Sequence, residues 1–479
     1  MEITMNLLGI DVGTTSLKAA AFDSEGRQLA SATVDYTLIT ENGFIEFEPD
    51  EYVSICRQAI AEIEKTVKID ALAIDTQGET LILTDENGAP VRRAIVWLDN
   101  RAEEEAKSIE EHFGAKRVYE VTGQPEITAG WPASKLLWVK NNEPEVFSKT
   151  KKIFMLEDYL IYKLSGEFAT EGSMQSSTIY FDINTGDWWD EMLEFIGISR
   201  ENLPRLVKSG QRIGQTPEGI TVSGGALDQI AGAIGAGIIR EHEMSEMTGT
   251  IMAICAVTDK LPPFNPESKV PCHYHAIDGK YCLLLWSPTA GMALKWYRNT
   301  FCPEISFREL DELAEKVAPG CEGLTMLPYL CGSTIPNYNP SAQGVFFGMT
   351  LAHGRGHFAR SILESVAFML KNDLEYLGDG YDTIKIMGGG AMSPLWCRIK
   401  ADVTGKTLTT LKNTETACLG SAILAGVGAG EFSSIEEAVE KLVETDLIYA
   451  PSGADYSEAY QRFNKLDDRL NNWKGGLWQ

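Results

Sequence analysis

Basic side chains are scarce in this sequence. Lys and Arg number 42 against 68 Asp and Glu, which gives a formal net charge of −26. An acidic surface of this kind repels nucleic acid and anionic membranes, because both carry negative charge. No run of basic residues offsets that charge. We therefore expect no nucleic acid and no membrane among the partners of the protein.

Long apolar runs and paired cysteines are also lacking. No apolar run approaches the ~18 residues that a membrane span needs, and the chain reaches its first apolar strand without a signal peptide. The nine cysteines are scattered, with no Cys-x-x-Cys pair, as is usual for reduced thiols. Cys272–His275 has no second ligand pair at a metal-site spacing, so we interpret it as a strand. These absences predict a cytoplasmic protein.

Two common nucleotide-binding motifs are missing. Lys400 stands where a P-loop would need its first glycine ahead of Gly405-Lys406-Thr407, and this excludes a P-loop protein. No Gly-x-Gly-x-x-Gly follows a predicted strand, which disfavours a Rossmann dehydrogenase. Any nucleotide must therefore be held by loops of another kind.

The length of 479 residues exceeds what one hydrophobic core usually supports, so two domains are expected. A weak internal repeat agrees with this expectation. When Gly13-Thr14 is laid on Gly249-Thr250, Asp11 falls on Met247. We place the break near Arg240, so that the two halves are nearly equal in length.

The two predicted domains are residues 1–240 and 241–479. In the first, an apolar hairpin at 7–22 precedes a predicted helix at 49–65 and a buried strand at 71–75. A hairpin followed by a crossover helix and another strand is typical of a mixed sheet. The expected fold class is α/β, with one mixed sheet in each domain.

The first hairpin turns at Asp11-Val12-Gly13-Thr14-Thr15-Ser16, where glycine is combined with three hydroxyl side chains. Backbone N–H groups and hydroxyls in such a turn can hold phosphate oxygens. Asp11, at the end of the strand, is suited to hold a divalent cation through water. The alternative is a plain hairpin in which the Asp and Thr side chains only satisfy the turn.

The stretch Ser223–Gly237 pairs one acid, Asp228, with several glycines. Glycines remove side-chain bulk, so backbone or ligand can come close to the acid. The small residues indicate a helix that packs tightly on a neighbour. The alternative is a helix crossing in which Asp228 serves only as a cap. The glycines are Gly224, Gly225, Gly232, Gly235 and Gly237.

Polar residues follow the predicted strand that ends at Asp75. Ligands of open α/β sheets bind beyond strand ends, which makes Gln77 and Glu79 binding candidates. Trp97 offers an aromatic wall, although tryptophan belongs to the core more often than to a ligand site. A later strand runs into Gly388–Ala391, where a flat nucleobase or ribose can lie on bare backbone. The alternative for these glycines is a steric strand–helix turn.

Two long patterns, Gly130–Asn142 and the run from Gly344–Met349 to His357–Glu364, carry a resemblance that covers essentially the whole chain. On these patterns the sequence resembles the FGGY family of carbohydrate kinases. That family belongs to the actin/Hsp70/hexokinase-like (ribonuclease H-like) fold group. The resemblance implies two domains, with ATP in the cleft between them.

The resemblance also implies roles for individual residues, with ATP and Mg²⁺ as cofactors. Asp228 would be the catalytic base, and Asp11 and Asp228 would lie beside the metal. The phosphates would be bound by Gly13, Thr14, Thr15, Lys18, Thr248, Gly249 and Thr250, and adenosine by Gly388, Gly389, Gly390 and Ser393. The substrate hydroxyls would be oriented by Gln77, Glu79, Trp97 and Gln229.

The nature of the sugar depends on two glycines. Gly78 and Gly130 stand where glycerol kinases have Arg and Tyr, and the loss of these side chains is expected to open space. We therefore expect a ketopentose such as xylulose, as in xylulokinases, with glycerol or another polyol as the alternative. A non-enzyme alternative is an ATP-switched binding protein of the same fold group. Since dimers are common in the family, a homodimer is one expected assembly.

Overall fold

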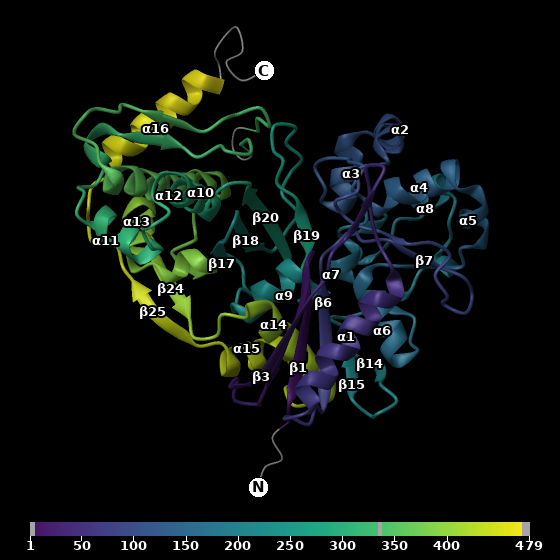
Figure 1. Ribbon diagram of the computed structural model, residues 1–479. Coiled ribbons are helices and arrows are strands. Elements are labelled where there is room, and N and C mark those ends of the chain that lie inside the picture. Colours follow the sequence, from purple (N-terminus) through teal and green to yellow (C-terminus); the bar gives the residue numbers. More distant parts are fainter. Residues whose placement is uncertain (1–4, 334–337, 472–479) are drawn as a thin grey trace.

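Two mixed seven-stranded sheets, one in each half of the chain, form the centre of the computed structural model, which describes residues 5–333 and 338–471. The first sheet has the order β14-β15-β6-β1-β2-β3, with β16 also beside β6, and the second has the order β19-β20-β18-β17-β23-β24-β25. Figure 1 shows the second sheet on the left and the N-terminal elements on the right. The predicted α/β fold with a mixed sheet in each half is confirmed.

The strands of the first sheet are β1 (Leu7–Val12), β2 (Ser16–Phe22), β3 (Gln28–Asp35), β6 (Ala71–Thr76), β14 (Arg212–Gln215), β15 (Thr221–Ser223) and β16 (Ala226–Leu227). Those of the second are β17 (Met244–Thr248), β18 (Met252–Thr258), β19 (Cys272–Tyr274), β20 (Tyr281–Ser287), β23 (Thr383–Met387), β24 (Thr407–Leu411) and β25 (Thr445–Tyr449). Smaller sheets contain β4 (Ile39–Glu41), β5 (Phe44–Phe47), β7 (Ile82–Thr84), β8 (Ala94–Ile95), β9 (Lys152–Phe154), β10 (Ala169–Glu171), β11 (Phe181–Asp182), β12 (Asp187–Trp188), β13 (Arg205–Val207), β21 (Thr325–Leu327) and β22 (Val345–Phe347).

The helices of the first half are α1 (Pro49–Glu64), α2 (Glu103–Phe113), α3 (Ala115–Thr122), α4 (Pro132–Asn142), α5 (Pro144–Lys149), α6 (Leu156–Ser165), α7 (Gly172–Gln175), α8 (Asp190–Ile196) and α9 (Asp228–Gly235). Those of the second half are α10 (Gly291–Phe301), α11 (Phe307–Glu315), α12 (Arg355–Leu377), α13 (Pro394–Thr404), α14 (Thr416–Ala429), α15 (Ile435–Leu442) and α16 (Ser457–Asn471). No helix among the described residues is long and apolar enough to cross a membrane.

The same strand arrangement occurs in both sheets. β1 pairs with β2 antiparallel and with β6 parallel, and β17 pairs in the same way with β18 and β23. Asp11 and Met247 are each the penultimate residue of their strands. The weak internal repeat in the sequence therefore corresponds to a repeated strand arrangement.

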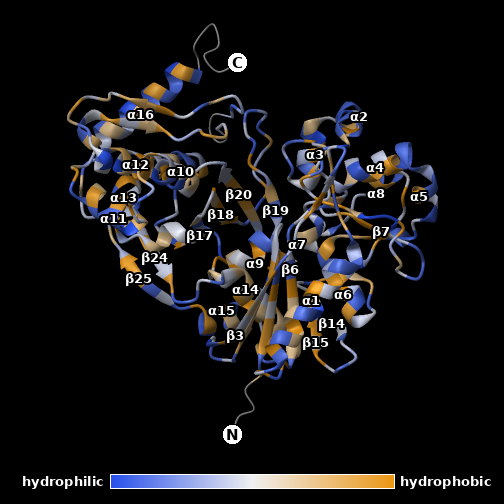
Figure 2. Cartoon of the chain, in the orientation of Figure 1, coloured by the Kyte–Doolittle hydropathy of each residue, from blue (hydrophilic) through white to orange (hydrophobic). Residues whose placement is uncertain are grey.

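The core of the first sheet is formed by its central parallel strands. All of β6 and nearly all of β1 are buried, and Figure 2 shows this part of the molecule as predominantly hydrophobic. Continuous apolar strands are expected where both faces of a parallel pair are covered. The polar ends of these strands are therefore the places where the sheet meets its surroundings.

Helix α14 belongs to the second half of the sequence, yet it packs against β1 and α9 of the first half (Figure 1). Three glycines make the contact. A Cβ atom would lie 1.8 Å from the carbonyl oxygen of Cys418 at Gly9, 1.9 Å from that of Ala231 at Gly420, and 1.8 Å from that of Thr416 at Gly235. Backbone therefore lies directly on backbone, which confirms the predicted tight packing of the small-residue helix. The division of the chain near residue 240 stays a prediction.

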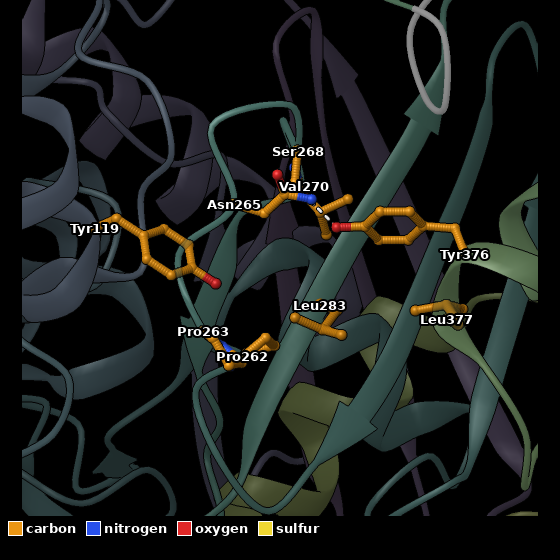
Figure 3. Close-up of a pocket in the computed structure, with 9 residues that line it drawn as sticks. All are labelled: Tyr119, Pro262, Pro263, Asn265, Ser268, Val270, Leu283, Tyr376 and Leu377. Carbon is orange, nitrogen blue, oxygen red and sulfur yellow. Dashed lines mark hydrogen bonds between the residues drawn. The ribbon is translucent and has the colours of Figure 1, made fainter.

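A second contact between the halves involves β19 and α3. The backbone N–H of Cys272 donates to the carbonyl oxygen of Gly123, at 2.9 Å. A cavity of about 150 Å³ lies beside this contact. Figure 3 shows Tyr119 of α3 on one side of the cavity and Tyr376 of α12, hydrogen-bonded to Ser268, on the other. As predicted, the Cys272–His275 region contains a strand.

Three elements, β9, β25 and α16, are not predicted from the sequence. β9 has only three residues, which is too few to show an alternating pattern. Nearly all of β25 is exposed, so it carries no apolar face. α16 does carry one, with Ala459 and Phe463 buried one turn apart.

The contact of α9 with α14 predicts opposite effects for two neighbouring glycines. Gly235→Ala would press its methyl group into the backbone of α14, and overpacking of this kind typically costs about 1–3 kcal/mol. Gly232→Ala is the matched control, because a Cβ there meets no atom within 4 Å, and alanine is favoured over glycine in a helix by about 1 kcal/mol. We expect the thermal midpoint to fall for Gly235→Ala and to hold or rise for Gly232→Ala. Equal midpoints for the two variants would contradict this packing.

Candidate active site

Three carboxylates meet at the ends of adjacent parallel strands. Asp11 of β1 and Asp75 of β6 are directly opposite each other in the strand register. Strand β16 pairs with β6 on its other side, and Asp228 follows β16 as the first residue of α9. Ligand sites of open α/β sheets lie beyond the carboxyl ends of such strands. The structure therefore brings Asp11 and Asp228 together, as predicted, and adds Asp75 between them.

The electrostatics of this cluster are unfavourable for three negative charges. Burial raises the pKa of Asp228 well above its ordinary value, and the charges of Asp11 and Glu79 raise it further. The backbone N–H of Gln229 donates to Asp228 Oδ1 at 2.7 Å and opposes this rise in pKa. The pKa of Asp75 is also raised well above its ordinary value, by burial and by its acidic neighbours. A shifted acid of this kind is typical of functional sites.

Asp75 is a candidate metal or phosphate-site residue that the sequence indicates only as the end of a strand. The hydroxyl of Ser421 donates to its Oδ2 at 2.6 Å. Its Oδ1 is buried and accepts no hydrogen bond from a described residue. The sequence signal was present, because Asp75 occupies the position on β6 that Asp11 occupies on β1.

These carboxylates suit a divalent cation. Mg²⁺ prefers oxygen ligands, and it usually takes one or two carboxylates together with water and substrate phosphates. The carboxyl groups of Asp75 and Asp11 lie close enough to shift each other's pKa, as such a site requires. Among the described residues, no group of three or more His, Cys, Asp or Glu side chains is arranged to hold a metal ion. A cation beside Asp11 and Asp228 would therefore need water or phosphate as further ligands.

Glu79 lies close enough to Asp228 to raise the pKa of that carboxyl group. It is half-buried and has a left-handed backbone, with φ of 56°. Burial raises its own pKa to about 7, while the buried ammonium of Lys135 opposes the rise. Lys135 Nζ donates to the carbonyl oxygens of Glu79 and Val96, each at 3.0 Å. Lys135 therefore fixes the strained turn that presents Glu79.

The other predicted substrate residues are placed less uniformly. Gln77 is buried, and its Nε2 donates to Thr80 Oγ1 at 3.2 Å, while its Oε1 accepts no hydrogen bond from a described residue. The indole N–H of Trp97 donates to Thr14 Oγ1 at 3.0 Å, so Trp97 contacts the first glycine loop (residues 11–18). Gln229 has an exposed side chain next to Asp228. Trp97 is thus a surface residue of the site rather than part of the core.

The space beside the two substrate-site glycines differs between them. At Gly130 a Cβ atom would meet nothing closer than 3.4 Å. At Gly78 it would lie 2.9 Å from Ser177 Oγ and 3.1 Å from Leu227 Cδ1. The expectation that Gly78 opens space is therefore wrong, because Ser177 and Leu227 already fill the volume that a side chain there would take.

In the first glycine loop, the backbone is fixed and the side chains vary in exposure. The N–H of Gly13 donates to the carbonyl oxygen of Ser16 at 3.0 Å, and Thr15 is exposed. Lys18 Nζ forms an ion pair with Glu415 Oε2 at 3.0 Å. Glu415 directly precedes α14, so Lys18 links the first loop to the second half of the chain. The loop keeps Thr15 accessible while Thr14 and Lys18 have partners.

The second glycine loop (residues 248–250) and the glycine turn at residues 388–390 contribute to the wall of one cavity of about 640 Å³. This cavity brings together six of the predicted residues, Thr248, Gly249, Thr250, Gly389, Gly390 and Ser393. Its wall also includes Trp296, Met292 and Trp396, which are large and largely apolar. The chamber combines bare backbone with aromatic surface, a composition that suits a flat heterocycle.

Three of the predicted residues in this region have contacts within the protein. Gly388 packs against Thr248, whose carbonyl oxygen would lie 2.8 Å from a Cβ there, and it does not line the cavity. The hydroxyl of Thr248 donates to Glu246 and accepts from Lys400, so it is not a free phosphate donor. Ser393 Oγ accepts from the N–H of Trp396 at 3.1 Å and caps α13. Its role at the cavity is therefore shared with that of a helix cap.

Comparison with known proteins agrees with this geometry. Residues 6–237 match the family model for the N-terminal domain of the FGGY family of carbohydrate kinases, and residues 270–429 match that for its C-terminal domain. The chain is 30% identical over 485 residues to xylulose kinase of Bacillus subtilis (strain 168), covering 97% of this chain and 96% of that protein. It is 29% identical over 504 residues to gluconokinase of the same strain, covering 98% and 97%.

A solved structure is similar over the same extent. Ligand-bound xylulose kinase from Lactobacillus acidophilus matches with a TM-score of 0.89 at 25% sequence identity, covering 98% of this chain and 99% of that one. The match confirms the two-domain α/β fold.

Proposed function

Because the chain belongs to the FGGY family of carbohydrate kinases, and is therefore a sugar kinase, we propose that it transfers the γ-phosphoryl group of ATP to a hydroxyl of a ketopentose such as xylulose. Membership of this family sets aside the non-catalytic, ATP-switched alternative. The observation that carries the proposal is the position of Asp228. It lies beside Asp11 and Asp75 at the ends of three adjacent strands, and close enough to Glu79 for the charge of Glu79 to raise its pKa.

Asp228 is the general base of the proposed reaction. A sugar hydroxyl is a weak nucleophile at neutral pH and must lose its proton as the bond to phosphorus forms. Asp228 accepts that proton, while Glu79, Gln77, Trp97 and Gln229 orient the substrate. Asp228 is bonded through Oδ1 to the backbone of Gln229, which leaves its other oxygen for the substrate.

Mg²⁺ beside Asp11, Asp75 and Asp228 would neutralise charge on the transferring phosphoryl group and favour the ionised form of Asp228. The phosphates are held by the backbone and hydroxyl donors of the two glycine loops. Phosphoryl transfer depends mainly on positioning and electrostatic stabilisation, which such loops supply. The adenosine group lies in the 640 Å³ cavity, on Gly389 and Gly390.

The charge of the site favours a neutral sugar over an aldonate. Identity to the xylulose kinase and to the gluconokinase is nearly equal, so it does not decide between them. A carboxylate substrate would add a negative charge beside Asp228 and Glu79, whose raised pKa values indicate that this site already disfavours negative charge. Lys135, the cation that acts on Glu79, uses its ammonium group for two backbone carbonyls. A neutral ketose avoids this repulsion.

The volume beside Gly130 favours a substrate larger than glycerol. A side chain at this position would have room, so its absence leaves that room to the substrate. Gly78 makes no such contribution, and the size argument depends on Gly130 alone. Glycerol or another small polyol is the alternative substrate.

We further propose that residues 1–240 and 241–479 act as two domains that close on the substrate. Closure excludes water, which would otherwise compete as phosphoryl acceptor. A cytoplasmic location and a homodimer complete the proposal, because both are usual in this family.

The role of Asp228 predicts a defect in catalysis without a defect in folding. Asp228→Asn keeps the shape of the side chain but cannot take a proton, so we expect kcat to fall ~10²–10⁴-fold. The thermal midpoint and the affinity for ATP should change little. Asp85→Asn is the control, since Asp85 accepts only backbone N–H groups in an exposed turn. A stable Asp228→Asn with near-normal kcat would refute the base assignment.

The adenosine assignment predicts a selective loss of nucleotide binding. At Gly389 the nearest atom to a Cβ is 4.0 Å away, so Gly389→Val is tolerated by the fold and fills the cavity instead. We expect the affinity for ADP to fall at least tenfold, about 1.4 kcal/mol, with the KM of the sugar unchanged. Gly354→Val serves as control, because a Cβ there also meets no atom within 4 Å. Equal losses for ADP and sugar, by calorimetry, would rule out this site.

The substrate proposal is tested with a panel of ketopentoses, glycerol and gluconate. We expect the best ketopentose to exceed glycerol in kcat/KM by about 10- to 200-fold, the range that a difference in pocket filling supports. Glu79→Gln should raise the KM of that sugar and leave the KM of ATP nearly unchanged. A preference for gluconate would contradict the charge argument, and a preference for glycerol would contradict the volume argument.

A further inference from the structure

A closed triangle of buried polar side chains lies behind the second glycine loop. Lys400 Nζ of α13 donates to Glu246 Oε2 and to Thr248 Oγ1, each at 2.7 Å. The hydroxyl of Thr248 donates to Glu246 Oε1. All three residues are at most 1% exposed. Each member of the triangle is therefore hydrogen-bonded to the other two, out of reach of solvent.

Burial of this ion pair is not explained by stability alone. Lys and Glu are rarely fully buried, and apolar side chains of similar volume often replace a buried ion pair without loss of stability. The same region holds another buried acid, Asp373 of α12. Its pKa is well above its ordinary value, because of burial and the charge of Glu246. Lys400 thus maintains charge in a place where an apolar core would be simpler. Such a buried pair is suited to a role in positioning.

Thr248 is the member of the triangle that touches the cavity. It ends β17, and Gly249 and Thr250 continue the cavity wall. The opposite wall also packs on Thr248. A Cβ at Gly390 would lie 2.6 Å from Thr248 Cβ, and one at Gly388 would lie 2.8 Å from its carbonyl oxygen. One threonine therefore sets the separation of the loop and the glycine turn.

Lys400 contacts the third wall of the cavity as well. Its ammonium lies 5.1 Å from the centre of the Trp396 ring, within the range of a cation–π interaction. Trp396 lines the cavity, and Ser393 caps the same helix at the cavity edge. A single buried cation thus connects β17, the glycine turn through Thr248, and the start of α13.

We propose that Lys400 is a positioning residue for the nucleotide. By holding Thr248 and Trp396 in place, it sets the distance between loop 248–250 and turn 388–390, and so the fit of the cavity to a purine nucleotide. The proposal rests on the proposed function for the identity of the ligand. The inference about Lys400 goes beyond the proposed function, because it assigns the fit of the cavity to the nucleotide to a residue that does not touch the nucleotide.

The test is the variant Lys400→Met, which keeps the length of the side chain and removes its charge and hydrogen bonds. We expect the Kd for ADP, measured by calorimetry, and the KM for ATP to rise at least tenfold. The KM for the sugar should stay within about twofold of the wild-type value, since Lys400 is on the nucleotide side. Thr248→Val removes the same hydroxyl bonds with little change of shape, and should shift ADP affinity in the same direction.

The control is Arg360→Met in α12. Arg360 forms a comparable buried ion pair with Glu364, at 2.8 Å, and also donates to Tyr456, but it does not line the nucleotide cavity. If buried pairs serve only stability, Lys400→Met and Arg360→Met will both lower the thermal midpoint and neither will alter ADP affinity. That outcome overturns the positioning role. A selective loss of ADP affinity in Lys400→Met and Thr248→Val supports it.

Thr248→Val keeps the test decisive if Lys400→Met does not fold, because wild-type ADP affinity in Thr248→Val overturns the proposal by itself. Failure of the proposed function has a separate signature. It would appear as no ADP release by the wild-type protein with any ketopentose. Equal Kd values for ADP in wild type and variants would instead reject the role of Lys400 while leaving the kinase assignment intact.

Discussion

The contact of three backbones, at Gly9, Gly420 and Gly235, is the constraint on which the site depends. β1, α14 and α9 lie so close there that any Cβ atom would overlap a neighbouring carbonyl group. Close-packed interiors resist compression, so this stack fixes the three elements rigidly. α9 carries Asp228 at its start, and α14 brings Ser421 to Asp75. The positions of the acids therefore follow from the absence of side chains elsewhere.

The acids of this cluster differ from the buried acids that have a basic partner. Asp99 is fully buried, but Arg101 beside it holds its pKa below the ordinary value despite burial. Glu246 has Lys400. Asp75 and Asp228 have raised pKa values instead, because burial and neighbouring acids act on them together. Because Asp75 and Asp228 have no basic partner among the described residues and lie beside Asp11, the site retains an electrostatic strain that a cation or a proton can relieve.

Local patterns in the sequence were sufficient for the hairpin loops, the strand ends and the small-residue helix, because each lies within a short stretch of chain. They were not sufficient for contacts made between distant stretches. Trp97 reaches Thr14, and Lys18 reaches Glu415, and nothing in either segment indicates its partner. The expectation of open space beside Gly78 was wrong for the same reason, since Ser177 fills that space from another part of the chain.

The two halves share a backbone arrangement but differ in where they place an acid. Asp11 and Met247 occupy the same position in their strands, while Glu246 lies one residue earlier. Successive side chains of a strand point to opposite faces, so that shift turns the acid of the second hairpin to the face opposite Met247, where Glu246 is buried beside Thr248. There Lys400 neutralises it, and Met247 remains 40% exposed in the place of Asp11. One copy of the hairpin is thereby suited to a cation, and the other presents an uncharged surface on which an anionic ligand meets no acid of its own strand.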